Sequence, residues 1–309
     1  RVLLAMRRAV ARRATTGALS GRVLVSTSTD PFFNLSLEAV LLRHAMPRAL
    51  LYVNQRCVVI GRNQNPWKEA RVEDVLVVRR RSGGGTVYHD LGNLNFALFS
   101  TRDDFVRERN ADLIAECIGR LGIPLERNAR NDLVWRGKKV SGSAYRLTDN
   151  VALHHGTLLV ASSLGDLGRL LRPGGELQGS WIASVPAPSG VANLSEARPG
   201  TTVEEVVEVL GGLGEEVVRV DRGSFPELVE MVEAERAEIV GGAWVFDRTK
   251  KFEALLEGLA PLTVEGGCIT SGMPGLEGVR FRLRDLQEHA PREVWTAYGD
   301  AFGFGSWKK

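Results

Sequence analysis

RRRSGGGTVYHDLGN, residues 79–93, places three arginines directly before three consecutive glycines and a polar run. Because glycine has no Cβ, three successive glycine amides can approach a phosphate or carboxylate closely, and the arginines would supply charge. The groups concerned are Arg79, Arg80 and Arg81, followed by Gly83, Gly84 and Gly85. A glycine-rich hairpin turn with a solvated basic flank is the simpler interpretation of SGGG alone. The choice between a turn and an anion cradle therefore depends on the rest of the chain.

The glycine stretch connects one predicted strand, residues 75–78, to another, residues 94–99. It therefore differs from the P-loop and Rossmann motifs, which lead from a strand into a helix, and neither GxxxxGK[ST] nor GxGxxG occurs in the chain. Apolar periodicity predicts further strands and helices in a mixed or antiparallel sheet of α+β class. The further strands are expected within residues 50–60, 133–135 and 151–160, and helices at 34–46 and 110–121.

Two helix starts are predicted in the second half of the chain. Thr202 with Glu205 has capping-box spacing, and so has Ser224 with Glu227, with Pro226 in the first turn. Two glycines at 241–242 then interrupt the helical pattern, and an apolar strand is expected over residues 243–246. We therefore expect a catalytic domain at residues 30–242 and a small accessory domain at residues 243–309.

Residues 1–29 contain six arginines and no acidic residue. This composition is typical of a transit peptide, so we set the segment apart from the fold. The expectation is import into the mitochondrial matrix, with removal of the residues before about Ser20.

The composition of the whole chain limits the possible functions. Its 40 Lys and Arg nearly balance its 37 Asp and Glu, so local basic patches are favoured over a uniformly basic nucleic-acid binder, and acidic protein partners remain compatible. Cys57, Cys117 and Cys268 form no CxxC pair, which disfavours a zinc site or a disulfide scaffold. We expect a monomer without a membrane span, in which Cys117 is a small core residue.

Three blocks, taken in order, carry a family resemblance. They are residues 79–93, residues 131–146 (NDLVWRGKKVSGSAYR) and residues 154–159 (HHGTLL). The chain resembles the lipoate-protein ligase A and mitochondrial lipoyltransferase family, whose pattern is RRxSGGGxVxHDxGN, NDL, KxSGxA and HHxTLL. Smaller matches are residues 58–67 (VVIGRNQNPW) and an S-V-then-N-L pattern at Ser184, Val185, Asn193 and Leu194.

The resemblance covers roughly residues 30–252 and implies a biotin/lipoate ligase-like catalytic domain with a small C-terminal accessory domain. Trp244 and Phe252 resemble the opening of that accessory domain, although Lys251 stands where the family motif usually has proline.

The resemblance also implies an activity. The lipoyl group of lipoyl-AMP, or of another lipoyl nucleotide, would be transferred to a lysine of lipoyl domains in 2-oxoacid dehydrogenase acyltransferases or of the glycine-cleavage H protein. A full ligase that uses lipoate plus ATP, with Mg²⁺, shares the same sequence blocks and remains an alternative. An octanoyl- or biotin-type protein acyl ligase is less favoured.

The residue-by-residue match assigns roles. Lys139, in KKVSGSA, is the predicted catalytic residue at the acyl-phosphate junction, where a compact ammonium suits a position between two oxygens. Asp132 is the predicted Mg²⁺ ligand, with Asn131 beside it. Without the motif, Lys139 would be one more exposed lysine beside Lys138, and the Asn-Asp pair a simple turn.

The remaining predicted binding residues contact the nucleotide or the lipoyl chain. They are Arg80, Ser82, Gly83, Gly84, Gly85, Thr86, Val87, Tyr88, Asn131, Gly142, Ser143, Ala144 and His155. A metal or general-base role for His89, His154 or His155 is less favoured, because adjacent residues of a strand point to opposite faces and ligand spacing is absent. At most one of His154 and His155 is expected to face the site.

Rival families differ in particular residues. Biotin ligases share the fold and the adenylate chemistry but have a differently composed glycine-arginine loop. Octanoyltransferases use a nucleophilic cysteine in the acyl pocket, and none of the three cysteines lies in the matching blocks. A non-enzymatic carrier would be expected to lack Lys139 or the arginines, and both are present.

Overall fold

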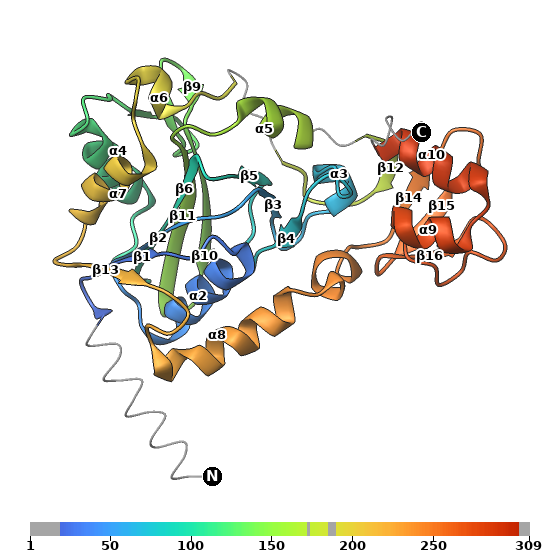
Figure 1. Ribbon diagram of the computed structural model, residues 1–309, viewed down its shortest axis with the longest axis horizontal. Coiled ribbons are helices and arrows are strands. Elements are labelled where there is room, and N and C mark those ends of the chain that lie inside the picture. Colours follow the sequence, from blue (N-terminus) through green and yellow to red (C-terminus); the bar gives the residue numbers. More distant parts are fainter. Residues whose placement is uncertain (1–18, 172–173, 185–189, 303–309) are drawn as a thin grey trace, which may run out of the picture.

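The computed structural model describes residues 19–171, 174–184 and 190–302. Its main sheet has six strands in the order β10-β11-β6-β2-β1-β13 (Figure 1). Their bounds are β1 (Val23–Ser26), β2 (Ala49–Val53), β6 (Asn93–Thr101), β10 (Ser141–Leu147), β11 (Val151–Leu159) and β13 (Val217–Val220). β1 pairs in parallel with β2 and β13, and the other pairs are antiparallel, so the sheet is mixed.

Helices cover both faces of the main sheet, because its strands alternate apolar side chains between two cores. One core joins Val23 and Phe96 to α4 (Arg107–Gly119) and α7 (Val203–Gly211). The other joins Leu24 and Phe99 to α2 (Pro31–His44) and α8 (Pro226–Ile239). Cys117 lies in the first of these cores, as predicted.

Two small sheets carry the sequence blocks of interest. The first has the order β4-β3-β5, formed by β3 (Cys57–Ile60), β4 (Val77–Arg79) and β5 (Val87–His89). The glycine loop connects β4 to β5, and α3 (Pro66–Glu69) follows β3. The second small sheet contains β7 (Glu126–Arg127), β8 (Leu133–Trp135) and β9 (Lys138–Lys139).

A four-stranded sheet in the order β12-β14-β15-β16 forms most of the C-terminal region. Its strands are β12 (Glu176–Gly179), β14 (Phe252–Leu255), β15 (Leu262–Glu265) and β16 (Cys268–Ser271), and α9 (Leu283–His289) and α10 (Arg292–Phe302) pack beside them. β12 therefore comes from the middle of the chain. Two short helices, α5 (Leu164–Leu170) and α6 (Leu194–Ala197), lie before and after it in sequence.

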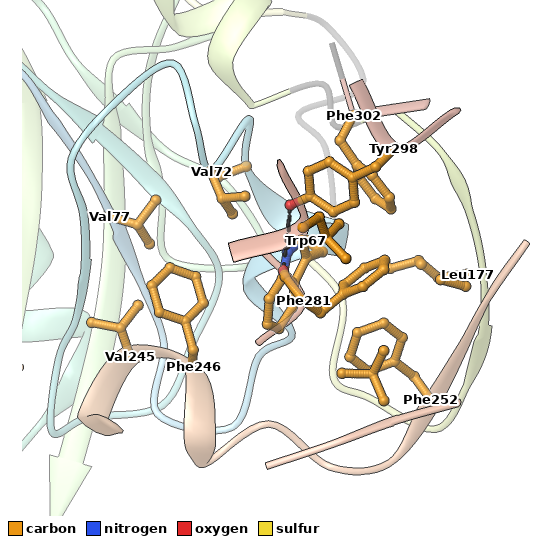
Figure 2. Packing of buried hydrophobic residues seen from close by; sticks show 14 of the residues in the cluster. Trp67, Val72, Val77, Leu177, Val245, Phe246, Phe252, Phe281, Tyr298 and Phe302 are labelled. Atoms are coloured by element: carbon orange, nitrogen blue, oxygen red, sulfur yellow. Dashed lines mark hydrogen bonds between the residues drawn. The ribbon is translucent and has the colours of Figure 1, made fainter. Parts of the chain in front are cut away.

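One hydrophobic core joins the C-terminal sheet to the three-stranded sheet β4-β3-β5 (Figure 2). Trp67 is its centre: the indole packs within 5.6 Å of the rings of Phe246, Phe252 and Phe281. The indole N–H donates a 3.1 Å hydrogen bond to the hydroxyl of Tyr298 on α10. The C-terminal region is thus packed directly onto the part of the chain that carries the glycine loop.

The predicted α+β class with a mixed sheet is confirmed, but three local predictions are wrong. Residues 50–60 are not one strand, because β2 and β3 belong to different sheets. Residues 243–246 form a π-helix, η1 (Ala243–Asp247), not a strand. The guanidinium of Arg79 binds the carbonyls of Trp244 and Val245, and the Trp244 indole donates back to the Arg79 carbonyl. These contacts satisfy the carbonyl groups of Trp244 and Val245, which in a strand would need partners on a neighbouring strand.

The third error concerns the cap of α8. Ser224 binds Asp221 instead of the helix, and the N-cap is Phe225, with no side-chain cap. The Thr202–Glu205 capping box is confirmed at α7.

Part of the segment that was set apart from the fold, residues 1–29, belongs to the fold. Residues 1–18 lie outside the described residues, but Leu19 is buried and β1 is an internal strand of the main sheet. Among the helices of the described residues, none is both long and apolar enough to cross a membrane.

Candidate active site

A cavity of about 390 Å³ is lined from both the main sheet and the three-stranded sheet β4-β3-β5. Its volume lies in the range of pockets that enclose drug-sized ligands. Both apolar side chains, such as Leu35, Val59 and Val87, and polar side chains line it. Lining residues include Leu35, Tyr52, Val59, Arg80, Gly84, Gly85, Thr86, Val87, His89, Asn95, Arg130, Asp132, Lys139, Gly142, Ser143, Ala144, His155, Gly156, Thr157, Ile182, Ala183 and Ser184.

The glycine loop closes one wall of this cavity, and Arg80 holds it in place. The Arg80 guanidinium donates to the carbonyls of Gly83 and Gly85 and to that of Val59 in β3. Burial lowers the pKa of Arg80 to about 10, so it stays charged at neutral pH. Within the described residues, no backbone amide of Gly83, Gly84 or Gly85 donates a hydrogen bond. The loop carbonyls are therefore satisfied while its amides remain free for an anion.

Only the middle arginine of the triplet lines the cavity. Arg79 is fully buried and binds carbonyl oxygens of η1 and of residues 61–64. Arg81 pairs with Glu235 and Glu238 on α8 and packs over the Trp244 ring. The expectation that all three arginines supply charge to one anion is wrong, because successive side chains of this segment point to different sides.

Lys139 and Asp132 form an ion pair in the lining of the cavity. The Lys139 ammonium lies 2.9 Å from Oδ1 of Asp132, and their side chains are 27% and 12% exposed. β9 ends at Lys139 and β8 begins directly after Asp132, so the hairpin β8-β9 brings the pair together. Arg130, which is exposed, adds a second cation to this end of the cavity.

The donor set around Asp132 fits a magnesium ion held mainly by substrate. No cluster of three or more His, Cys, Asp or Glu side chains suited to a metal occurs in the described part of the chain. Magnesium commonly takes one or two carboxylates together with waters and substrate phosphates, so a single Asp132 beside a phosphate site is sufficient.

A series of buried, hydrogen-bonded polar side chains lies behind Arg80. Arg80 Nε donates to Ser82 Oγ, which is 2.8 Å from His155 Nε2, and His155 Nδ1 is 2.9 Å from a carboxylate oxygen of Glu38. The Tyr52 hydroxyl donates to the same carboxylate. Every member of the series is buried, so the series fixes the position of Arg80 from behind.

The two adjacent histidines point to different sides, as predicted. His155 lines the cavity, whereas His154 contacts Ser143 on β10 and stacks with Tyr145. His89 also lines the cavity, and its pKa is lowered to about 3 by burial and then by the charge of Arg80. His89 is therefore neutral at neutral pH.

The structure brings most of the predicted residues to the cavity. Those that line it are Arg80, Gly84, Gly85, Thr86, Val87, Asp132, Lys139, Gly142, Ser143, Ala144 and His155. Four others do not line it. Ser82 contacts His155, and the Gly83 carbonyl accepts a hydrogen bond from Arg80. Tyr88 packs in the core around Trp67, and Asn131 contacts Arg127 and Glu108. The position of Tyr88 follows from strand alternation: Val87 and His89 face the cavity, so the side chain of Tyr88 between them points to the other face.

Residues 182–184 form a wall of the cavity that was not predicted from the sequence. Ser184 accepts from the Thr86 amide, and its own amide and hydroxyl donate to the buried carboxylate of Glu69. The S-V match at Ser184 was the available signal, although Val185 lies outside the described residues. Thr157, within the HHGTLL block, was a second missed lining residue and accepts from the Gly142 amide.

Comparison with known proteins agrees with this geometry. Residues 30–212 match the family model for the lipoyl protein ligase A/B catalytic domain. A lipoate-protein ligase A of Psychrobacter cryohalolentis is 36% identical over 256 residues, which cover 76% of this chain and 75% of that protein. A candidate lipoate-protein ligase A of Schizosaccharomyces pombe is 38% identical over 192 residues, 59% of this chain. The match spans about half, 53%, of that second relative's length.

Solved structures share the fold. LipL1 of P. falciparum in complex with lipoate has a TM-score of 0.62 at 23% identity, covering 86% of this chain and 93% of that one. ATP-bound lipoate-protein ligase A has a TM-score of 0.57 at 22% identity, covering 73% and 96%. The bipartite lipoate protein ligase of Thermoplasma acidophilum, described with its E2 lipoyl domain, also has a TM-score of 0.57 at 22% identity, covering 74% and 95%.

The fold and the sequence relatives define an enzyme of the acyl-transferring ligase class. More particularly, the chain belongs to the lipoyl protein ligase A/B catalytic domain family.

Proposed function

We propose that this protein transfers a lipoyl group from a lipoyl nucleotide, lipoyl-AMP in the first instance, to a specific lysine of lipoyl-domain proteins. The observation that carries the proposal is a single cavity that combines an apolar interior with Lys139, Asp132 and a glycine loop whose amides are free. An acyl nucleotide requires these two environments side by side: apolar walls for the chain and cationic or amide donors for the phosphate.

The acyl chain would lie against the apolar part of the lining, which includes Leu35, Val59 and Val87. The phosphate would lie toward Lys139 and the loop amides of Gly84 and Gly85, with the ammonium leaving Asp132 to contact phosphate oxygens. Asp132 would then be available to Mg²⁺, which neutralises phosphate charge when bound.

Transfer requires no covalent enzyme intermediate. The acceptor lysine amine attacks the acyl carbonyl, the new amide C–N bond forms, the C–O bond to the phosphate breaks, and AMP and the amine proton leave. Lys139 and the loop amides would stabilise the negative charge that develops on the carbonyl and phosphate oxygens. All three cysteines lie outside the cavity lining, which disfavours the octanoyltransferase chemistry that uses a cysteine nucleophile.

A full ATP-dependent ligase is the second candidate. It is favoured by the names of the relatives and by the fold shared with an ATP-bound lipoate-protein ligase A. Incubation with free lipoate, ATP and Mg²⁺, without acceptor, distinguishes the two candidates. Release of pyrophosphate indicates that the protein forms its own lipoyl nucleotide, and its absence indicates transfer only.

Replacement of Lys139 tests the proposed transfer. Lys139→Ala is expected to slow single-turnover transfer from purified lipoyl-AMP to a lipoyl domain by about 100-fold or more, because it removes a charge from the reacting centre. Lys138→Ala is the matched control, since Lys138 is the exposed neighbour on the same short strand. Near-normal transfer by Lys139→Ala, or an equal loss in both variants, would contradict the assigned role.

The proposed acceptors are lipoyl domains of 2-oxoacid dehydrogenase acyltransferases and the glycine-cleavage H protein, and the proposed compartment is the mitochondrial matrix. The resemblance and the archaeal neighbour described with an E2 lipoyl domain support the acceptors. The arginine-rich, acid-free residues 1–29 support the compartment. N-terminal sequencing of the mature protein tests it: an intact amino terminus in a cytosolic fraction would reject import.

A further inference from the structure

Two arginines beside the cavity form no ion pair in the part of the chain that the structure describes. Arg62 is exposed just after β3, and Arg146 is half-buried on β10. Within the described residues, neither side chain makes a hydrogen bond or an ion pair. Such a pair differs from Arg79 and Arg81 nearby, whose guanidinium groups are fully engaged.

Arg146 lies in a surplus of positive charge. Its pKa is lowered first by burial and then by repulsion from Arg43 and Arg62, while Glu235 opposes the effect. Glu235 is shared by Arg43 and Arg81, and Arg81 takes an additional carboxylate from Glu238. The guanidinium groups of Arg43, Arg62, Arg81 and Arg146 thus lie near Glu235 and Glu238, and Glu235 already pairs with two of them. The other carboxylate beside Arg146, that of Glu38, is already in contact with His155 and Tyr52.

This cluster flanks one edge of the cavity. Arg146 lies two residues beyond Ala144 on the same face of β10, and Ala144 lines the cavity. A Cβ on Gly84 would lie 2.9 Å from Ala144 Cβ, and a Cβ on Gly61 would lie 2.2 Å from the Gly84 carbonyl oxygen. Arg62 directly follows Gly61 in the chain, so both free arginines lie just outside the closed Gly84–Ala144 edge.

The position of the arginine cluster suits contact with a docked macromolecule better than contact with a nucleotide in the cavity. Neither Arg62 nor Arg146 belongs to the lining of the main cavity, although Arg146 lines a small pocket of about 10 Å³ together with Arg80 and Ser82. Along β10, Arg146 is four residues from Gly142, or about 13 Å at the usual rise per residue. A protein interface of about 800 Å² per partner is on the order of 30 Å across, so one docked domain would cover both the cavity and the cluster.

We propose that Arg62 and Arg146 form the docking contact for the acceptor protein and bind carboxylates on the domain that presents the target lysine. Guanidinium groups suit this purpose because they bind carboxylates through two parallel hydrogen bonds. An acidic partner also relieves the repulsion within the cluster. The inference rests on the proposed lipoyl transfer to a protein lysine and adds the surface on which that protein docks.

Charge reversal tests the docking contact. The variants are Arg62→Glu, Arg146→Glu and the double substitution, each compared with Arg219→Glu. Arg219 is an exposed arginine on β13, at the opposite edge of the six-stranded sheet from β10. Each protein receives purified lipoyl-AMP and either a lipoyl domain or hydroxylamine, a small nucleophile that needs no docking surface.

Each single reversal is expected to slow the second-order transfer to the lipoyl domain about tenfold, with the double variant slower still, because like charges repel at the contact. Formation of lipoyl hydroxamate is expected to match the wild type in all variants, as is domain transfer by Arg219→Glu. Wild-type domain transfer should fall as salt rises, and the double variant should lose that dependence. Recovery of Arg146→Glu by an Asp→Arg change on the acceptor would support direct pairing.

Other outcomes overturn the inference in distinguishable ways. Unchanged domain transfer by the double variant rejects the docking contact and leaves the proposed function standing. An equal loss with hydroxylamine shows that the arginines serve the donor site or the fold. Inhibition of hydroxamate formation by inorganic phosphate, in the wild type but not in the variants, shows a free-phosphate site instead. Failure of the wild type to modify any lipoyl domain rejects the proposed function itself.

Discussion

The tautomer of His89 is determined by a chain of hydrogen bonds that runs through Asn54 and Asn34 to the carbonyl of Ser28. Asn34 Nδ2 donates to the carbonyl of Ser28 and to Asn54 Oδ1, so the Asn54 amide must turn its Nδ2 toward His89 Nδ1, at 2.9 Å. Nδ1 therefore accepts, and a neutral His89 carries its proton on Nε2. That Nε2 has no hydrogen-bond partner within the described residues, which leaves a donor at the cavity wall.

Acid should destabilise the protein through its buried neutral histidines. Burial lowers the pKa of His89 and of His154 to about 3, below the unfolded value. Between the ordinary pKa of about 6.5 and about 3, the unfolded chain binds more protons, so the free energy of unfolding falls as pH falls. The expected slope is about 1.4 kcal/mol per pH unit for each histidine in that window.

Urea unfolding at pH 7 and pH 5 measures this effect. His154→Gln, at a residue outside the cavity lining, should lose the contribution of one histidine. A pH dependence that is the same in the wild type and in His154→Gln would show that this histidine is not buried neutral.

The sequence predicted the cavity residues best where a motif fixed both residue type and spacing. Lys139 and Asp132 were each assigned separately, and the hairpin β8-β9 brings them to 2.9 Å. The arginine triplet was predicted less well, because composition alone does not tell which guanidinium faces a ligand. Arg79 is taken up by carbonyls of η1, more than 160 residues away in the sequence, and no local pattern indicates that contact.

At the scale of elements, the turn after β3 and the glycine loop touch through their backbones. A Cβ on Gly61 would lie 2.2 Å from the Gly84 carbonyl oxygen, too close for any side chain. Arg80 fixes the carbonyls on either side of Gly84, so the loop cannot shift away independently. The position of the loop amides thus depends on a glycine that lies outside the loop.

Gly61→Ala is therefore expected to displace the glycine loop and to lower kcat/KM for lipoyl transfer. A misplacement of about 1 Å at a reacting centre can cost on the order of 100-fold, so a loss of at least about tenfold is expected. Steady-state transfer to a lipoyl domain measures the change. Gly83→Ala is the control, since a Cβ at Gly83 meets nothing within 4 Å and the amide is retained. Equal activity of the two variants would contradict the backbone contact.

The elements were predictable to the extent that their signals are local. The capping box at Thr202 is confirmed because Glu205 reaches the N-cap amide within one turn. The same spacing at Ser224 fails because the Ser224 hydroxyl binds Asp221 in the preceding turn. The π-helix η1 replaces a predicted strand, since the apolar run of Trp244, Val245 and Phe246 fits either structure until its tertiary contacts are known.

At the scale of the whole molecule, the C-terminal region and the sheet β4-β3-β5 share one core. Tyr298 ties them together through its hydrogen bond with the Trp67 indole (Figure 2). Its hydroxyl also donates a 3.2 Å hydrogen bond to Glu73. Because this core is continuous, we expect both regions to unfold in a single transition.

Tyr298→Phe tests this coupling. The substitution keeps the ring but leaves the buried Trp67 N–H without an acceptor, so the unfolding free energy should fall by about 1–3 kcal/mol. Denaturant titration followed by tryptophan fluorescence and far-ultraviolet circular dichroism measures it, with coincident curves expected. Thr296→Val on the exposed side of α10 is the control and should stay within about 0.5 kcal/mol. An earlier, separate transition in one signal would contradict a shared cooperative unit.

The long-range strand pairings were beyond sequence reasoning. β1 lay in a segment set apart for its arginine content, yet it pairs with β13, and Val23 is in register with Val217. β12 has four residues with a single buried side chain, Leu177, so no alternation indicated a strand there. Both pairings depend on contacts between residues far apart in the chain, for which a single sequence gives no signal.

The pairing of β12 with β14 has a consequence for synthesis on the ribosome. Glu176 is in register with Leu255, so the strand that leads into the cavity wall at residues 182–184 emerges long before its partner. At about 5–20 residues per second, the strand waits several seconds at least for β14. The nascent chain therefore cannot complete this cavity wall until β14 has been made, and a product that ends before β14 is expected to lack lipoyl-transfer activity.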